Sequence, residues 1–96
     1  MLIAKVVGTT VSTIKDEKLM GRKLLILRQT DECGHPVGKH YVAVDTVDAG
    51  AGDLVLTCAG SSARQTAITK DTPVDAVIMS VIDSLEVDGT VVFRKA

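Results

Sequence analysis

Short runs of aliphatic and β-branched residues, each ended by glycine, proline or a charged cluster, constrain this chain most. We count five or six such runs, at residues 2–14, 23–29, 41–47, 53–59, 76–86 and 90–95. Valine, isoleucine and threonine favour extended backbone, whereas glycine and proline mark turns. So many short strands in 96 residues predict an all-β fold, a small closed or nearly closed barrel without exposed sheet edges.

Residues 74–87 carry two conflicting patterns. Their apolar positions recur at helical spacing, but their valines and isoleucines favour a strand. Asp88 and Gly89 follow, and Asp-Gly between two β-rich runs is a strong hairpin signal. We therefore expect a strand over residues 76–86 that pairs with residues 90–95.

Two glycine-containing stretches are predicted to be turns. Residues 30–40 contain two glycines and a proline and are expected to form a loop, whose role we leave open. Residues 48–52 read DAGAG, and their glycines allow a positive φ. Gly8 is expected to mark a bend in the first strand.

One short helix is predicted after the fourth strand. Ser62 and Gln65 stand at the spacing of a capping box, in which each side chain satisfies a backbone N–H of the other residue. We expect a helix of one or two turns over residues 63–68. Pro73 prevents it from running further.

Residues 50–66, which read GAGDLVLTCAGSSARQT, raise the possibility of a phosphate loop or a serine nucleophile. No lysine follows the glycines at the spacing of a phosphate loop, and the segment runs into a strand instead of a helix, so the dinucleotide fingerprint also fails. A nucleophile elbow requires a glycine where Arg64 stands. Ser62 is better explained as a helix cap than as a nucleophile.

The histidines and cysteines predict no metal site, cofactor site or disulfide. Cys33, His35 and His40 lie in one loop, at spacings that match no standard zinc pattern, and a solvated loop explains them better. Cys58 lies in a different segment, and we expect two reduced thiols in a cytoplasmic protein.

Composition excludes several function classes. The net charge is −1 and aromatic residues make up only 2% of the chain, so we expect no nucleic-acid binding, which needs a basic groove and stacking platforms. No segment approaches the length of a membrane span, and no signal peptide is evident. Hydrophobic residues make up 46% of a small chain, which predicts apolar surface left over for association with further copies.

Three blocks of the sequence resemble a known family. They read AKVVGTTVSTIKDEKLMGRKLLIL, VAVDTVDAGAGDLVLTCAGSSAR and PVDAVIMSVIDSLEV, and together they extend over most of the chain. The second block, with its GAG-D-x-V-L run and its GSSAR ending, is the most specific. The chain resembles the EutN/CcmL proteins, the pentameric vertex components of bacterial microcompartment shells.

The resemblance implies a single domain over residues 1–96, a five-stranded OB-like barrel with one short helix that assembles into a cyclic pentamer. It further implies a structural protein without enzymatic activity. Such a pentamer closes the vertices of a polyhedral shell that is otherwise tiled by hexameric proteins and that encloses metabolic enzymes in the cytoplasm. Carboxysomes and several catabolic compartments, including that for ethanolamine, use similar proteins, and the sequence does not distinguish among them.

Within this interpretation, small residues allow close subunit approach and Arg64 fixes the register by a charge-assisted hydrogen bond. We expect five residues to form the subunit contact or the surface near the axis, namely Gly60, Ser61, Ser62, Ala63 and Arg64. A solvated Arg64 is the competing interpretation. The alternative function is a stand-alone OB-like barrel that binds single-stranded nucleic acid or a small ligand.

Overall fold

The computed structural model describes residues 1–10, 22–59 and 76–95, and these form seven strands. The strands are β1 (Leu2–Thr9), β2 (Leu24–Thr30), β3 (Pro36–Asp45), β4 (Leu54–Ala59), β5 (Ala76–Val81), β6 (Ser84–Val87) and β7 (Thr90–Arg94). The helix expected at residues 63–68 lies outside the described residues. In the part that is described, no helix is long and apolar enough to span a membrane.

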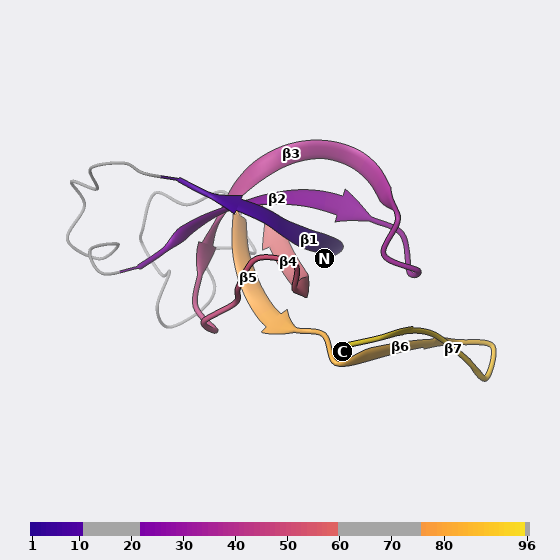
Figure 1. Ribbon diagram of the computed structural model, residues 1–96. Coiled ribbons are helices and arrows are strands. Elements are labelled where there is room, and N and C mark those ends of the chain that lie inside the picture. The colour runs from indigo at the N-terminus through magenta and orange to yellow at the C-terminus, as the bar shows by residue number, and fades with distance from the viewer. Residues whose placement is uncertain (11–21, 60–75, 96) are drawn as a thin grey trace.

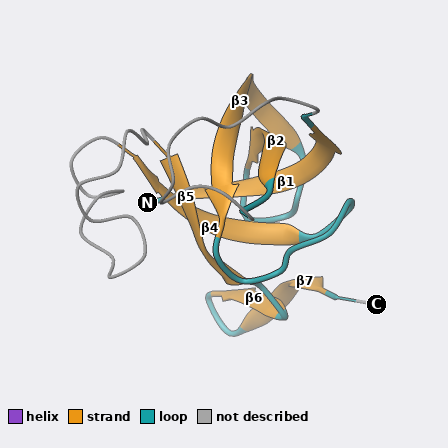
Figure 2. Ribbon diagram, turned by 90° about the vertical axis from the view of Figure 1, so that its left-hand side faces the viewer, coloured by secondary structure: helices purple, strands orange, loops and turns teal. Residues whose placement is uncertain are grey.

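Five strands close into a barrel in the order β1-β2-β3-β5-β4, as Figures 1 and 2 show. All neighbours pair antiparallel except β3 and β5, which run parallel where Val44 and Asp45 face Val77 and Ile78. The remaining pair, β6 and β7, forms a separate two-stranded sheet. The expected all-β five-stranded barrel is therefore confirmed.

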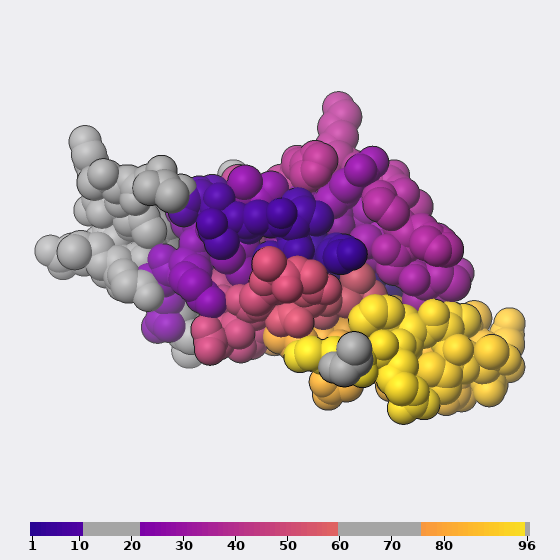
Figure 3. Space-filling model, in the orientation of Figure 1, coloured from indigo at the N-terminus to yellow at the C-terminus, as the bar shows by residue number. Residues whose placement is uncertain are grey.

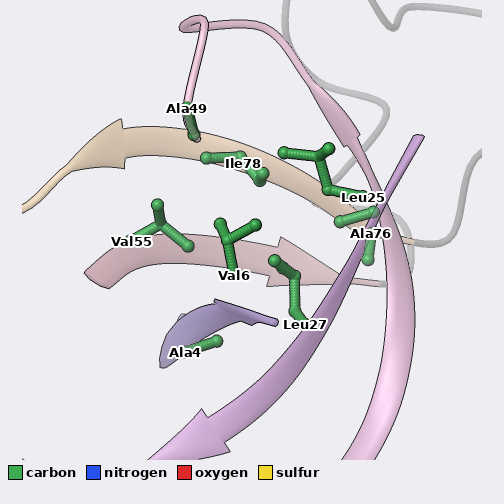
Figure 4. Close-up of a cluster of buried hydrophobic side chains, with 9 residues drawn as sticks. Ala4, Val6, Leu25, Leu27, Ala49, Val55, Ala76 and Ile78 are labelled. Carbon is green, nitrogen blue, oxygen red and sulfur yellow. The ribbon is translucent and has the colours of Figure 1, made fainter. Parts of the chain in front are cut away.

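The barrel interior is filled by small aliphatic side chains that alternate along each strand. Ala4 and Val6 point inward from β1, and Leu25 and Leu27 do so from β2, because successive side chains of a strand face opposite sides (Figure 4). The other buried members of this cluster are Ala43, Ala49, Val55, Ala76 and Ile78. With no tryptophan and only two aromatic residues in the chain, close packing of branched chains supplies the core.

A second apolar cluster lies on the opposite side of the same strands. Val44 and Val77 are paired across β3 and β5, and Cys58 of β4 pairs with Val77 on its other side. Leu24 of β2 packs against this cluster and pairs with Val44. These strands therefore bury side chains on both faces at this end of the barrel.

Tyr41, one of the two aromatic residues, is half-buried against the core. Its hydroxyl group lies 2.8 Å from the hydroxyl of Thr57, and the two form a hydrogen bond across the barrel. Burial raises the pKa of Tyr41 above its ordinary value of 10.0, although the bond to Thr57 lowers it in part.

The prediction that residues 30–40 form only a loop was wrong, because β3 already begins at Pro36. Pro36 stands at the first position of the strand, where its missing N–H is tolerated. A Cβ at Gly38 would lie 2.9 Å from the Cβ of Gln29, so this glycine allows β2 and β3 to pack closely. Pro36 and Gly38 are therefore both compatible with a strand at these positions.

The single strand predicted over residues 76–86 is in fact two strands. The backbone N–H of Ile82 donates to the carbonyl of Leu54, and the chain then leaves the barrel to form β6. The predicted hairpin turn is confirmed: Asp88 and Gly89 have φ values of 51° and 80° between the paired strands β6 and β7.

The strands predicted at residues 23–29, 53–59 and 90–95 match β2, β4 and β7 to within one residue at each end, whereas β3 begins well before the predicted range 41–47. β1 ends at Thr9, and the rest of its predicted range, up to residue 14, falls almost entirely outside the described residues. The bend expected at Gly8 is present as a β-bulge, because the pairing of β1 with β2 shifts register between Val6 and Gly8.

Candidate assembly surface

The five residues expected at a subunit contact lie outside the described residues; they are Gly60, Ser61, Ser62, Ala63 and Arg64. The described chain does fix where their segment starts and ends. Ala59, the last residue of β4, pairs directly with Ala76, the first residue of β5. Ala59 and Ala76, which flank this segment in the sequence, are therefore neighbours at one end of the barrel.

The connection from β3 to β4 is locked by Asp45, whose side chain is buried. Its Oδ1 accepts hydrogen bonds from the backbone N–H groups of Val47, at 3.0 Å, and Ala49, at 3.2 Å. Next to it, the hydroxyl of Thr46 donates to the carbonyl of Ile78 at 2.7 Å. These bonds hold the connection against β5.

Lys23 joins this connection to the start of β2. Its Nζ donates to Asp48 Oδ1 at 2.9 Å and to the carbonyl of Ala49 at 3.1 Å, and it lies 3.3 Å from Asp45 Oδ2. The bond to Asp48 raises the pKa of Lys23 and lowers that of Asp48. Asp45 Oδ2 is buried and accepts no well-aligned hydrogen bond from the described residues, and the charge of Lys23 lies close enough to compensate it.

The glycines of the GAGD run shape a turn that is bonded to β1. Gly52 has a φ of 89°, its N–H donates to the carbonyl of Val6 at 2.9 Å, and the N–H of Val6 donates to Asp53. The Asp53 side chain accepts the N–H of Gly50 at 2.9 Å. A positive φ is confirmed for Gly52, and residues 50–53 form a hydrogen-bonded turn.

Asp31 organises the loop between β2 and β3. Its Oδ1 accepts the N–H groups of Cys33 and His35, both at 2.9 Å, and the bond from His35 contributes most to lowering the pKa of Asp31. Nowhere in residues 1–10, 22–59 and 76–95 do three histidine, cysteine, aspartate or glutamate side chains gather as a metal site would require. The loop is therefore a capped turn with an exposed thiol at Cys33.

Two cationic side chains and a histidine cross the outer face of β1, β2 and β3 in one line, which we call the cationic row. Lys5 pairs with Arg28, and Arg28 pairs with His40 on its other side. Arg28 Nε donates to the carbonyl of Gly38 at 3.0 Å, which fixes its direction. No salt bridge to this row occurs within the described part of the chain.

An apolar line runs parallel to the cationic row on the same outer face. Ile26 pairs with Val42, and both alternate with inward-facing residues of the core. Val42 and the bulged residue Val7 are exposed. The outer face of β1, β2 and β3 thus combines basic side chains with exposed aliphatic side chains.

The sheet of β6 and β7, residues 84–94, forms a second exposed surface, which we call the hairpin arm. Figure 3 shows it as a yellow lobe beside the barrel. Its base is anchored, because Lys95 N–H donates to the carbonyl of Asp83 and Lys95 Nζ lies 3.7 Å from Asp53. Toward the tip, Val87 and Val91 are exposed.

Sequence reasoning did not predict the contacts of Lys23 or the cationic row. It predicted the hairpin but not that the hairpin lies outside the barrel. The pairing of Lys5, Arg28 and His40 depends on register, which residue patterns alone did not give. A signal for the arm was present in the sequence. Valines stand on both sides of the Asp-Gly turn, and the acidic residue Glu86 precedes that turn.

Comparison with protein families gives a match over most of the chain. The family described as ethanolamine utilisation protein EutN/carboxysome matches residues 1–83. The carboxysome shell vertex protein CcmL of Gloeobacter violaceus is 42% identical over 95 residues, which cover 99% of this chain and 95% of the relative. The bacterial microcompartment shell vertex protein EutN of Salmonella typhimurium is 39% identical, with coverage of 99% and 96%.

Solved structures agree with these sequence matches. The structure of Gloeobacter violaceus CcmL superposes with a TM-score of 0.89, over 99% of this chain and 98% of that one. The GrpN pentameric microcompartment shell protein from Rhodospirillum rubrum superposes with a TM-score of 0.79 at 42% identity, over 91% and 99% of the two chains. The barrel described above is therefore the fold of these shell proteins.

Proposed function

The chain belongs to the EutN/CcmL family, whose relatives are shell vertex proteins, and on that premise we propose that it caps the vertices of a bacterial microcompartment shell as a homopentamer. The observation that carries this proposal is the likeness over nearly the whole chain to relatives named for that role. A solved neighbour of the same fold is described as pentameric.

The function is structural, because the matched relatives are named as shell proteins and none of them as an enzyme. The shell of a microcompartment is accordingly the site of action. A polyhedral shell needs five-fold units at its corners, and a heterologous head-to-tail contact between copies closes into such a ring when its rotation fits.

The partners of the pentamer are proposed to be hexameric shell proteins that meet its outer rim. We also propose that the ring does not bind nucleic acid, since the chain has a net charge of −1 and two aromatic residues. The stand-alone nucleic-acid or ligand-binding barrel, the alternative from the sequence, finds no support among the relatives.

Five residues are proposed to contribute to the subunit contact or to the surface near the axis: Gly60, Ser61, Ser62, Ala63 and Arg64. The support is chemical: the first four are small, and Arg64 can make paired hydrogen bonds to a carboxylate or carbonyl group. Arg64→Ala should shift the ring toward single chains on dilution, with Arg64→Lys intermediate because it keeps the charge without the planar fork. An unchanged mass distribution for Arg64→Ala would remove this residue from the contact.

The pentamer itself is tested by native mass spectrometry of the intact chain over a dilution series. A main species of five times the 10.1 kDa chain mass supports the proposal. A stable single chain at micromolar concentration contradicts it.

A further inference from the structure

The cationic row places basic side chains next to each other on one face of the barrel. Lys5 of β1 lies directly opposite Arg28 of β2, and Arg28 lies directly opposite His40 of β3. The residues that follow the first two, Val6 and Leu27, are buried in the core, so the row points outward. Side chains opposed in this way have Cβ atoms about 5 Å apart, so the whole row is about 10 Å long.

No acidic side chain of the described residues compensates the row. Every salt bridge among them joins residues that lie outside it. The other sheet neighbour of Lys5 is Leu54, and the described part of β5 does not extend beside His40. Like charges directly opposite each other on neighbouring strands destabilise a sheet. Because the whole chain has 11 basic and 12 acidic residues, the row is a local excess of positive charge and does not reflect a basic composition.

Arg28, at the centre of the row, is already held in place. Its side chain is half-buried, and its Nε donates to the carbonyl of Gly38 at 3.0 Å. No described residue accepts a hydrogen bond from its two terminal amino groups. A guanidinium group binds oxyanions through such paired donors. Since its direction is fixed beforehand, Arg28 loses less side-chain freedom when an anion binds.

Aliphatic side chains lie beside the row on the same face. Ile26 and Val42 pair with each other two residues along their strands from Arg28 and His40, which places them roughly 7 Å away. They exclude water from one side of the row. Charge pairs that are partly shielded from water are screened less by salt than fully solvated pairs. The face therefore favours a bound anion more than isolated surface lysines would.

We propose that the cationic row binds a diphosphate group, either free or carried by a larger molecule. The terminal amino groups of Arg28 bind one phosphate, and Lys5 and His40 bind oxygens on either side. A single phosphate bridges two neighbouring side chains, whereas a diphosphate has charged oxygens at both ends and reaches all three. The site belongs to one barrel, so the inference goes beyond the proposed ring and does not rest on it.

Calorimetric titration of the intact chain tests the site, in metal-free buffer of low ionic strength. Inorganic diphosphate should bind once per chain, at least about tenfold more tightly than inorganic phosphate, and added sodium chloride should weaken it. Adenosine diphosphate distinguishes the sources. A lower affinity for it identifies free diphosphate as the ligand, and an equal or higher affinity identifies diphosphate within a larger molecule. No saturable binding up to about 10 mM diphosphate would overturn the inference.

Two arginine variants locate the site. Arg28→Gln should weaken diphosphate binding by at least about tenfold, because it removes the paired donors. Arg94→Gln is the matched control: it makes the same change of charge at an exposed arginine of β7, outside the barrel. It should leave the affinity unchanged. An equal loss in both variants would mean that the anion responds only to overall charge, which would also overturn the site.

Lys5→Glu separates loss of the site from loss of the fold. The new carboxylate faces Arg28 directly and compensates it within the chain, so diphosphate binding should disappear while the free energy of unfolding does not fall. Diphosphate should raise the melting temperature of the parent and leave that of Lys5→Glu unchanged. Binding that persists in Lys5→Glu contradicts the inference. A ring that binds no diphosphate likewise contradicts it but leaves the proposed function intact.

Discussion

The barrel and the hairpin arm are built from similar residues, but only the barrel encloses a core of fully buried side chains. Val77 in the barrel is 0% exposed, whereas Val87 and Val91 in the arm are 42% and 44% exposed. The barrel closes on itself and buries one side of every strand, and a closed sheet has no edges to protect. The arm has only two strands, and Val87 and Val91 near its tip stay exposed in the single chain.

This difference separates folding from assembly. Substitutions in the barrel should lower the free energy of unfolding, and substitutions at the tip of the arm should act on the association of copies. The predictions below test that separation, and they run from the largest expected loss of barrel stability to the smallest.

Leu27→Ala should have the largest effect, because Leu27 is fully buried between β1 and β3 in the barrel core. Loss of its side chain leaves a cavity and should lower the free energy of unfolding by about 2–5 kcal/mol. Urea denaturation at one fixed chain concentration measures it, since assembly shifts the apparent stability. Met79→Ala, at a partly exposed position of β5, is the control. An equal loss of unfolding free energy in that variant would show that burial does not determine the size of the loss.

Asp45→Ala should rank second, because it leaves the N–H groups of Val47 and Ala49 without their acceptor. We expect a loss of about 1–3 kcal/mol in the same assay. Asp45→Asn keeps an acceptor oxygen but removes the charge that faces Lys23, so it should lie between the parent and Asp45→Ala. If Asp45→Ala is as stable as the parent, the turn is not locked by this side chain.

Ionisation of Tyr41 should lower the free energy of unfolding by a smaller amount, and only at high pH. Because burial raises its pKa, the phenol stays neutral in the fold at a pH where it ionises in the unfolded chain. Its contribution is present below pH 10.0, the ordinary value, and is lost as the pH rises through the higher pKa of the folded state. Tyr41→Phe should flatten the stability profile in that range, and an unchanged alkaline slope would exclude Tyr41 as its source.

Val87→Ser should change barrel stability least, within about 0.5 kcal/mol, because the side chain is exposed at the tip of the arm. The same variant should weaken the ring, which native mass spectrometry measures on dilution. Thr90→Ser, at the position paired with Val87, controls for the loss of a methyl group from the hairpin. A variant that lowers barrel stability but leaves the ring intact would reverse the division between the two regions.

Residue patterns were enough to predict the barrel and the Asp-Gly hairpin. Alternation of β-branched residues located the strands, and the turn between β6 and β7 has the backbone that Asp88 and Gly89 favour. The start of β3 was missed because Pro36 and Gly38 favour loops locally. Their fit within the sheet depends on strand position and on contact with Gln29, which are tertiary facts.

The break between β5 and β6 was missed for a related reason. Residues 76–86 have strand propensity throughout, and the chain leaves the barrel where Ile82 bonds to Leu54, a partner distant in sequence. The cationic row likewise depends on the register of three strands. Propensity indicates which residues form strands, whereas pairing decides which side chains become neighbours.

Imaging of assembled shells tests the central claim, that this chain closes the vertices of a shell, most directly. The intact chain would be co-produced with hexameric shell proteins of a bacterial microcompartment, and the particles examined by electron cryomicroscopy with and without it. We predict closed polyhedra with five copies of this barrel at each vertex, and particles with open vertices when the chain is omitted. Shells whose vertices are filled equally well without this chain would contradict the account.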